Sequence, residues 1–250
     1  MREAPRLRVA FFRPDDERTE EAVELVESLG ADPVPDPMLA VEPTDAAPRS
    51  DADYVVLTSK TGAELAAAAD WDPDGATVCA IGDATAAALR AEGYAVDHVP
   101  AEFSSAGLVD SLGDAVDGAR VEVARSDHGS AVLTDGLEAA GAYVHETVLY
   151  RLVRPESAGE STELAAAGDL DAALFTSSLT VEHFLAAADE RGVRAAAIEG
   201  LDAATVGVIG EPTRETARAH GITVDVVPDR ADFEALACAV VEDAAPTHHE

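Results

Sequence analysis

A short glycine motif that occurs twice is the first candidate binding site in this chain. Its copies are Ile81-Gly82-Asp83-Ala84-Thr85 and Ile209-Gly210-Glu211-Pro212-Thr213. In each copy an apolar stretch precedes the glycine, which predicts a buried strand, a tight turn and a helix that begins near the threonine. Such a turn points free backbone N–H groups at the carboxyl end of the strand, where an anion can bind. The threonine of each copy either contacts a ligand or serves only as a helix cap.

Hydroxyl side chains form the second candidate, at the ends of two further predicted strands. Leu57-Thr58-Ser59 precedes the first glycine motif and Phe175-Thr176-Ser177 precedes the second. Helix capping explains at least one hydroxyl in each group, and Thr61 and Glu64 have the spacing of a capping box. The remaining hydroxyls can then face a ligand. Lys60 is the only lysine of the chain, and it is either a charge for a carboxylate or a solvated residue at a helix start.

Two more predicted strands, residues 9–13 and 121–125, each end in an arginine, Arg13 and Arg125. Ligands of open α/β sheets bind outside the carboxyl ends of the strands, so an arginine at each of these ends suits an anionic ligand. Each arginine could equally pair with a neighbouring acid such as Asp15 or Asp127. Both alternatives remain open.

The elements that must position these residues repeat along the chain. Gly93 and Gly221 each follow the glycine of their motif by 11 positions, where a helix C-cap is expected. Pro100 and Pro228 each follow by a further 7 positions. Where the two copies differ in spacing, a longer loop at residues 189–200 absorbs the difference. This agreement over many steps predicts a tandem structural repeat.

Strands and helices alternate through the whole chain, and the composition changes at residues 33–50 and 154–168. Such changes are typical of crossings between domains. We therefore expect two domains, one of which is inserted at about residues 41–150. Alternation of this kind predicts the α/β class, with a doubly wound parallel sheet of five strands in each domain.

The charge balance is extreme, with 49 acidic residues against 17 basic ones and a net charge of −32. A hydrophobic fraction of 47% and regular periodicity argue against disorder. Self-repulsion of this size predicts adaptation to concentrated salt, because the Debye length falls to ~3 Å at 1 M. The chain also lacks a basic patch for phosphates, so we expect no nucleic-acid partner.

Hydropathy and cysteine usage place further bounds on the protein. No run approaches the ~18 apolar residues of a membrane span, and residues 1–8 lack the apolar core of a signal peptide. We expect a cytoplasmic monomer with no membrane partner. Cys79 and Cys238 have no metal-binding spacing, so both are expected to be buried small apolar residues. The adjacent pair His248-His249 lies at a polar terminus, and we predict no metal site.

Taken together, these motifs resemble the uroporphyrinogen-III synthase family, the tetrapyrrole-pathway enzymes that close hydroxymethylbilane into uroporphyrinogen III. The resemblance extends over nearly all of the chain. It rests on the order, spacing and duplication of the motifs rather than on any one of them. The motifs are residues 9–14, 56–59, 81–85, 147–150, 174–177 and 209–213.

This resemblance implies two α/β domains, residues 1–38 with 153–250 and residues 41–150. It implies a short two-stranded connector at about residues 38–43 and 148–154, with the substrate held in the cleft between the domains. It also implies hydroxymethylbilane as the small-molecule substrate and no cofactor.

Residue by residue, the resemblance places the family's two threonines on Thr85 and Thr213 and its cleft tyrosine on Tyr150. Tyr150 is the candidate catalytic residue, a proton donor to the departing hydroxyl, unless it only packs the connector with its own hydroxyl in water. Relatives often have Gly-Arg where this chain has Gly129-Ser130, which leaves the role of Arg125 open. The candidate substrate contacts are Arg13, Thr58, Ser59, Lys60, Gly82, Thr85, Arg125, Thr176, Ser177, Gly210 and Thr213.

The implied chemistry depends on positioning. Loss of the terminal hydroxyl leaves an electrophilic azafulvene, which closes directly to the type I isomer or attacks the substituted position to give a spiro intermediate. Fragmentation and recyclisation of that intermediate invert ring D, so the enzyme must hold the chain in the geometry of the second route. The alternative is a non-catalytic two-domain binder or sensor of a small anion, whose elements would look the same. A nucleotide-dependent transferase is disfavoured because the chain lacks a P-loop and a G-x-G-x-x-G motif.

Overall fold

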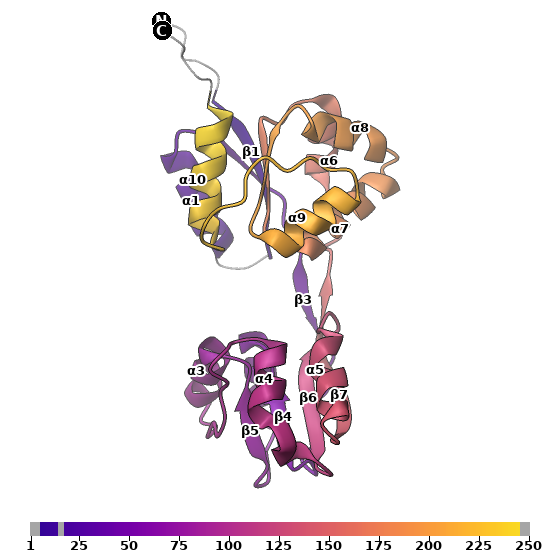
Figure 1. Ribbon diagram of the computed structural model, residues 1–250. Coiled ribbons are helices and arrows are strands. Elements are labelled where there is room, and N and C mark those ends of the chain that lie inside the picture. Colours follow the sequence, from indigo (N-terminus) through magenta and orange to yellow (C-terminus); the bar gives the residue numbers. More distant parts are fainter. Residues whose placement is uncertain (1–5, 15–17, 246–250) are drawn as a thin grey trace, which may run out of the picture. The chain divides into compact units, whose positions relative to one another are not determined.

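The computed structural model describes residues 6–14 and 18–245. The chain forms two compact units, Met1–Ala40 with Val153–Glu250 and Val41–Leu152 (Figure 1). We call the first the split unit and the second the inserted unit. These bounds lie close to the domain boundaries expected from the sequence. No helix within the described residues is long and apolar enough to cross a membrane.

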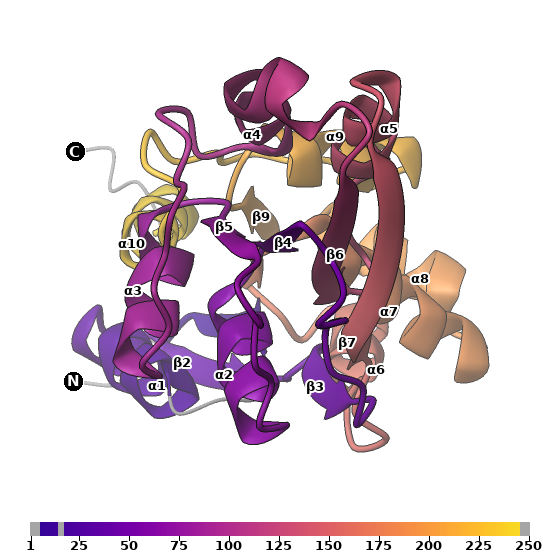
Figure 2. The ribbon, with the colours of Figure 1, turned by 90° about the horizontal axis from the view of Figure 1, so that it is seen from below.

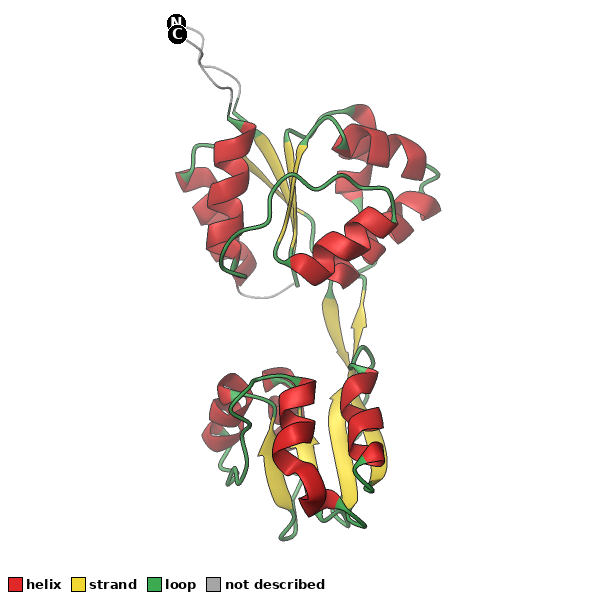
Figure 3. Cartoon of the chain, viewed as in Figure 1, coloured by secondary structure: helices red, strands yellow, loops and turns green. Residues whose placement is uncertain are grey.

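The sheet of the split unit has four parallel strands in the order β2-β1-β8-β9. The strands are β1 (Arg8–Phe12), β2 (Asp32–Pro35), β8 (Ala172–Phe175) and β9 (Thr205–Val208). Helices α1 (Arg18–Ser28) and α10 (Phe233–Ala244) pack on one face. On the other face lie α6 (Glu160–Ala167), α7 (Ser178–Glu190), α8 (Arg194–Leu201) and α9 (Glu211–Ala219). Figure 3 shows the strands of this unit between its two helix layers.

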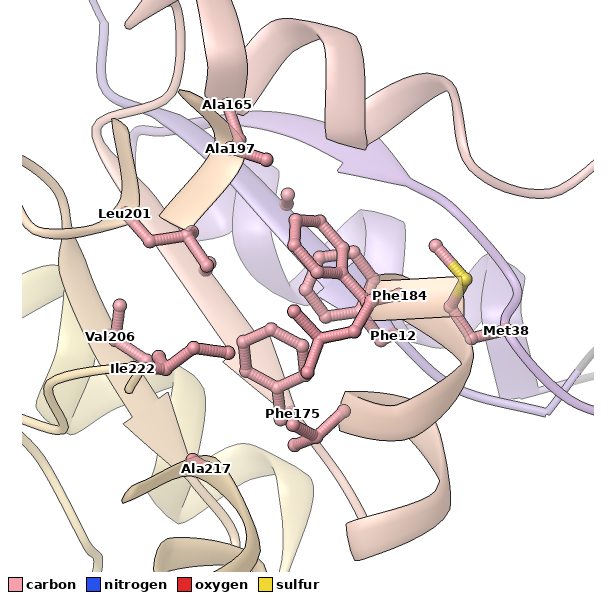
Figure 4. Packing of buried hydrophobic residues seen from close by; sticks show 14 of the residues in the cluster. Phe12, Met38, Ala165, Phe175, Phe184, Ala197, Leu201, Val206, Ala217 and Ile222 are labelled. Atoms are coloured by element: carbon pink, nitrogen blue, oxygen red, sulfur yellow. The ribbon is translucent and has the colours of Figure 1, made fainter. Parts of the chain in front are cut away.

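Strand β1 shows why both faces must be covered. Val9 and Phe11 pack with α1 and α10, while Ala10 and Phe12 pack on the opposite side. A parallel sheet buried on both faces needs such continuous apolar strands. Phe12 and Phe175 have ring centroids 4.5 Å apart and form an aromatic core with a phenylalanine from α7 (Figure 4).

The inserted unit has a five-stranded sheet in the order β3-β7-β6-β4-β5. Its strands are β3 (Ala40–Pro43), β4 (Tyr54–Leu57), β5 (Thr77–Ala80), β6 (Arg120–Ser126) and β7 (Tyr143–Val153). Helices α2 (Lys60–Ala68) and α3 (Asp83–Ala91) pack on one face. The other face carries α4 (Ser105–Leu112), the 3₁₀ turn η1 (Gly113–Val116) and α5 (Ala131–Ala139). These helices are seen on either side of the strands in Figure 2.

The expectation of five strands in each sheet is wrong for the split unit, whose described residues form four. The segment after α9 makes only one isolated bridge, between Gly207 and Val226. The physical reason is that the Asp225 carboxylate accepts the N–H of Val206 at 2.8 Å, in place of a backbone carbonyl. The corresponding segment after α3 in the inserted unit also makes one isolated bridge, between Cys79 and His98. The fifth strand of that sheet is β3 instead.

Strand β3 lies beside β7 at the junction of the two units, where the two-stranded connector was expected. Just after β3, the backbone N–H of Thr44 donates to the carbonyl of Leu149 at 3.0 Å. The Thr44 hydroxyl donates to the carbonyl of Val148 at 2.6 Å. Thr44 therefore fastens the start of the inserted unit to its last strand.

The two cysteines differ from each other. Cys79 is buried in β5, and burial raises the pKa of its thiol to about 12, with a smaller contribution from the charge of Asp97. Cys238 is exposed on α10, so the expectation that both are buried is wrong for this residue. Helix α10 buries Leu236 and Val240, and Cys238 falls on the side away from that apolar face. The pair His248-His249 lies outside the described residues.

Candidate functional site

Each unit brings its predicted site residues to one edge of its sheet. Strands β7, β6, β4 and β5 are parallel neighbours. Arg125 near the end of β6, Ser59 after β4 and Gly82 after β5 therefore lie at the same edge of the inserted unit. In the split unit, Arg13 and Thr176 share the edge from which Gly210 leads into α9.

The two glycines occupy the same backbone conformation. Gly82 is the N-cap of α3 with φ −174° and ψ 175°, and Gly210 is the N-cap of α9 with φ −177° and ψ 177°. Neither helix has a side chain that accepts a hydrogen bond from its first turn. The first turn of each helix therefore keeps N–H groups that have no intrahelical partner, and such groups favour an anion.

Thr85 and Thr213 are not helix caps, so the interpretation of these threonines as caps is wrong. Each is the third residue of its helix, because the extended glycine ends the strand and starts the helix within one residue. Thr85 is 4% exposed and Thr213 is 3% exposed. Glu211, which follows Gly210, is paired with Arg214 at 2.9 Å within the same helix. Its negative charge is thus partly offset beside the candidate anion site.

The strand-end serines are the true helix caps. Ser59 caps α2 by accepting the N–H of Gly62 at 2.9 Å. Ser177 caps α7 and forms a capping box with Thr180, which confirms helix capping at this group. The prediction of a capping box between Thr61 and Glu64 is wrong, because α2 already begins at Lys60. The Glu64 carboxylate instead pairs with Lys60, with 3.5 Å between Oε1 and Nζ.

The remaining hydroxyls and Lys60 differ in their availability. Thr58 is half-buried directly before the cap of α2. The Thr176 hydroxyl donates to the carbonyl of Phe12 at 2.6 Å and so joins the ends of β8 and β1. Lys60 is 70% exposed. A long, exposed ammonium group can reach a ligand only by leaving its weak pairing with Glu64.

Tyr150 is buried, with 7% exposure, and its hydroxyl has a partner within the protein. It donates to the Ser59 Oγ at 3.0 Å, and the same Oγ accepts the N–H of Gly62. Tyr150 is therefore linked through Ser59 to the amino end of α2. This places the phenol among the strand-end groups of the inserted unit.

Arg125 is engaged within its own unit. Its Nε donates to Glu146 at 3.0 Å, its Nη1 donates to the carbonyl of Ser130 at 2.6 Å, and the side chain is 7% exposed. A Cβ atom on Gly129 would lie 2.3 Å from the Arg125 Cδ, so glycine is needed there for the arginine to pass. The geometry supports local pairing for Arg125, with Glu146 as the partner in place of the expected Asp127.

Arg13 has an aromatic support at the carboxyl end of β1. Its guanidinium carbon lies 4.5 Å from the centroid of the Phe233 ring. Both residues line a cavity of about 240 Å³ at this edge, together with Arg18, Glu21 and Glu234 among others. A guanidinium over an aromatic ring is stabilised by the ring's negative face, and its planar fork of N–H donors suits a carboxylate.

Two further residues of these edges were not predicted from the sequence. Arg18 begins α1 and lines the same cavity as Arg13. Phe103 is 59% exposed and lies against Gly82. Their signals in the sequence were weak, a basic residue at a helix start and an aromatic residue directly before a serine cap. Both residue types are common in such positions on a protein surface.

These groups offer hydrogen-bond donors rather than a nucleophile. Uncapped helix starts, hydroxyls and an arginine such as Arg13 are groups able to donate to an anion, and none of the predicted strand-end residues is a histidine or cysteine. Such a site suits a ligand with several carboxylates that has to be held in a defined conformation.

Comparison with known proteins agrees with this chemistry. The family model of uroporphyrinogen-III synthase HemD matches residues 20–238. A putative uroporphyrinogen-III synthase of Methanothermobacter thermautotrophicus is 34% identical over 255 residues, covering 94% of this chain and 99% of the relative. A uroporphyrinogen-III synthase of Synechococcus elongatus is 29% identical over 168 residues, covering 63% and 64%.

Solved structures show the same fold. A uroporphyrinogen III synthase of Thermus thermophilus aligns with a TM-score of 0.68 at 21% identity, covering 95% of this chain and 98% of that one. The uroporphyrinogen-III synthetase of Helicobacter pylori aligns with a TM-score of 0.61 at 14% identity, covering 95% and 99%.

Proposed function

This chain belongs to the uroporphyrinogen-III synthase family, and from that membership we propose that it cyclises hydroxymethylbilane to uroporphyrinogen III with inversion of ring D. The family is one of cyclising lyases in tetrapyrrole biosynthesis. The observation that carries the proposal is the pair of helix starts at Gly82 and Gly210. Each lies at a carboxyl edge without a side-chain cap, and each unit contributes one.

These helix starts match the charge of the substrate. Each helix amino end carries the equivalent of about half a positive charge, which favours a carboxylate. Hydroxymethylbilane presents acetate and propionate carboxylates along a linear chain of four pyrroles. Matching backbone angles at Gly82 and Gly210 support our view of the chain as a tandem repeat of two doubly wound domains. We propose that both copies bind carboxylates of one substrate molecule.

The chain's own groups then position the substrate and handle one proton. A pyrrole nitrogen expels the terminal hydroxyl, and Tyr150 supplies the proton with which it leaves as water. The phenolate regains a proton from the ring carbon that loses its hydrogen when the macrocycle closes. Ser59 holds the phenol in place. Anchored carboxylates keep the azafulvene carbon over the substituted position, so the spiro route wins over direct closure.

The proposal is tested by incubating the protein with freshly made hydroxymethylbilane and separating the isomers. Hydroxymethylbilane closes without an enzyme to the type I isomer. We expect the type III isomer in excess. A non-catalytic binder of anions would leave type I as the product, and that result would contradict the proposed function.

Thr85 and Thr213 should act together on the bound substrate. We expect each alanine substitution to raise KM by about 10-fold, since one hydrogen bond to a charged group contributes ~1.5 kcal/mol or more. If both threonines bind the same conformer of the substrate, the free-energy change of the double variant should differ from the sum of the two single changes. Strictly additive losses with an unchanged isomer ratio would remove the case for one shared ligand.

Tyr150→Phe should slow turnover by about 10-fold, at the low end for a positioned acid, because the hydroxyl also leaves without an enzyme. The product should remain mostly type III, since geometry selects the isomer. The measurement is single-turnover consumption of hydroxymethylbilane with isomer analysis.

Ser59→Ala is the matched control, because it breaks the same hydrogen bond and keeps the phenol. It also removes the cap of α2, at a cost of about 1 kcal/mol in stability. Slower turnover in Tyr150→Phe than in Ser59→Ala assigns the additional loss to the proton rather than to the positioning of the phenol by Ser59. An unchanged rate in Tyr150→Phe would mean that the residue only packs, and a loss beyond ~10³-fold would contradict catalysis by positioning.

A further inference from the structure

An exposed aromatic ring covers the glycine motif of the inserted unit. Phe103 lies in the loop between α3 and α4 and is 59% exposed. A Cβ atom on Gly82 would lie 3.1 Å from the Phe103 Cγ and 3.2 Å from its Cβ, closer than ordinary packing. Gly82 has an extended backbone that any residue can adopt. The approach of the ring, rather than the backbone conformation, therefore favours a glycine at this position.

The loop holds Phe103 in this position from both sides. The next residue, Ser104, caps α4 by accepting the N–H of Gly107 at 2.9 Å. Ser104 also donates its hydroxyl to Glu102 at 2.9 Å. A Cβ atom on Gly107 would lie 2.3 Å from the carbonyl oxygen of Glu102, so the turn is tightly closed. The ring is thus exposed and held in place, which lowers the entropy lost when a ligand packs against it.

Among the described residues of the split unit, no aromatic ring lies against Gly210. Gly210 occupies the same backbone conformation, but the nearest atom to a Cβ there would be the Pro212 Cδ at 4.0 Å. Counted from the proline that follows each motif, the position of Phe103 is held by Ala231. The two helix starts therefore share their hydrogen-bond donors and differ in their apolar surface. Only the start of α3 combines an anion site with an aromatic face.

We propose that Phe103 is a specificity-determining residue that packs against one pyrrole ring of the substrate while the start of α3 binds a carboxylate of the same ring. This assignment rests on the proposed function. Its chemistry requires a ligand with an acidic arm on a flat ring, which is the repeating feature of hydroxymethylbilane. Offset or edge-to-face contact between aromatic rings adds to the gain from buried area. Holding that ring restricts the conformers from which closure starts.

The experiment is Phe103→Ala with steady-state kinetics and isomer analysis, with Phe103→Tyr as the conservative variant. We expect Phe103→Ala to raise KM by about 3- to 10-fold with a smaller change in kcat, the range expected for loss of one aromatic pair. The type I fraction should rise. Phe103→Tyr keeps an aromatic face, so its KM and type I fraction should both be close to those of the wild type. Melting should be unchanged, since the ring is exposed.

Tyr143→Ala is the matched control, because Tyr143 is 71% exposed at the first residue of β7, at the opposite edge of the same sheet. It should leave KM and the isomer ratio at wild-type values. Equal KM and isomer ratio in Phe103→Ala and wild type would overturn the assignment of Phe103 alone. Absence of type III product from the wild type would instead overturn the proposed function, so the two failures are distinguishable.

Discussion

Asp36→Ala should lower the free energy of unfolding by roughly 2–6 kcal/mol, because it leaves two buried N–H groups without an acceptor. Asp36 is 5% exposed and follows β2. Its Oδ1 accepts the N–H of Gly159 at 2.8 Å, and its Oδ2 accepts the N–H of Ser161 at 2.9 Å together with the Ser161 hydroxyl. Helix α6 has no side-chain cap of its own from Gly159. A carboxylate 123 residues earlier therefore caps it.

This contact joins the two chain segments that build the split unit on either side of the insertion. Its loss should lower the melting temperature by roughly 2–4 °C for each kcal/mol. Asp32→Ala is the control, since it removes the same charge from an exposed residue of the same region. Ser161→Ala removes one of the three donors to Asp36, so its melting temperature should lie between those of Asp36→Ala and Asp32→Ala. Equal melting of Asp36→Ala and Asp32→Ala in the same salt would show that the buried carboxylate does not stabilise the unit.

Transfer to dilute buffer should unfold and inactivate the protein. Its net charge of −32 raises the free energy of the compact state when the charges are not screened. The Debye length is about 10 Å at 0.1 M salt and ~3 Å at 1 M, so most of the repulsion is screened only in concentrated salt. A polyanionic substrate is repelled by the same field. The measurement is melting temperature and turnover across a NaCl series.

A variant with less negative charge separates screening from other effects of salt. Asp135→Asn and Glu138→Gln neutralise two exposed acids on α5. This double variant should reach the same melting temperature at lower NaCl than wild type. Full activity and an unchanged melting temperature at low salt would contradict adaptation to concentrated salt.

Much of the local architecture follows from short-range patterns in the sequence. Apolar stretches before Gly82 and Gly210 predict the buried strands β5 and β9, because a parallel sheet needs apolar residues on both faces. Gly93 and Gly221 have φ of 91° and 82° just after their helices, as the C-cap pattern predicts. These features depend on residues within one or two turns of each other. The α/β class and the order of elements follow from them.

Helix starts were less predictable, because several residues compete for one cap. Thr61, Thr85 and Thr213 are plausible caps by type, but the helices begin earlier, at Ser59 or at a glycine. Packing of the strand ends decides the competition. The first helical residue is set by where the strand leaves the sheet, and propensity alone does not carry that information.

Local patterns along the chain define the strand ends, the glycine turns and the types of side chain placed there. The partners of these side chains depend on the tertiary structure. Tyr150 meets Ser59 across 91 residues, and Arg125 meets Glu146 across 21, because β7, β6 and β4 are neighbours in the sheet. The physical reason is that strand order and register bring distant residues together, while periodicity reports only which face of its own element a residue occupies. Phe103 lies against Gly82 because the loop after α3 returns to this end of the sheet, and no local pattern in the sequence predicts that contact.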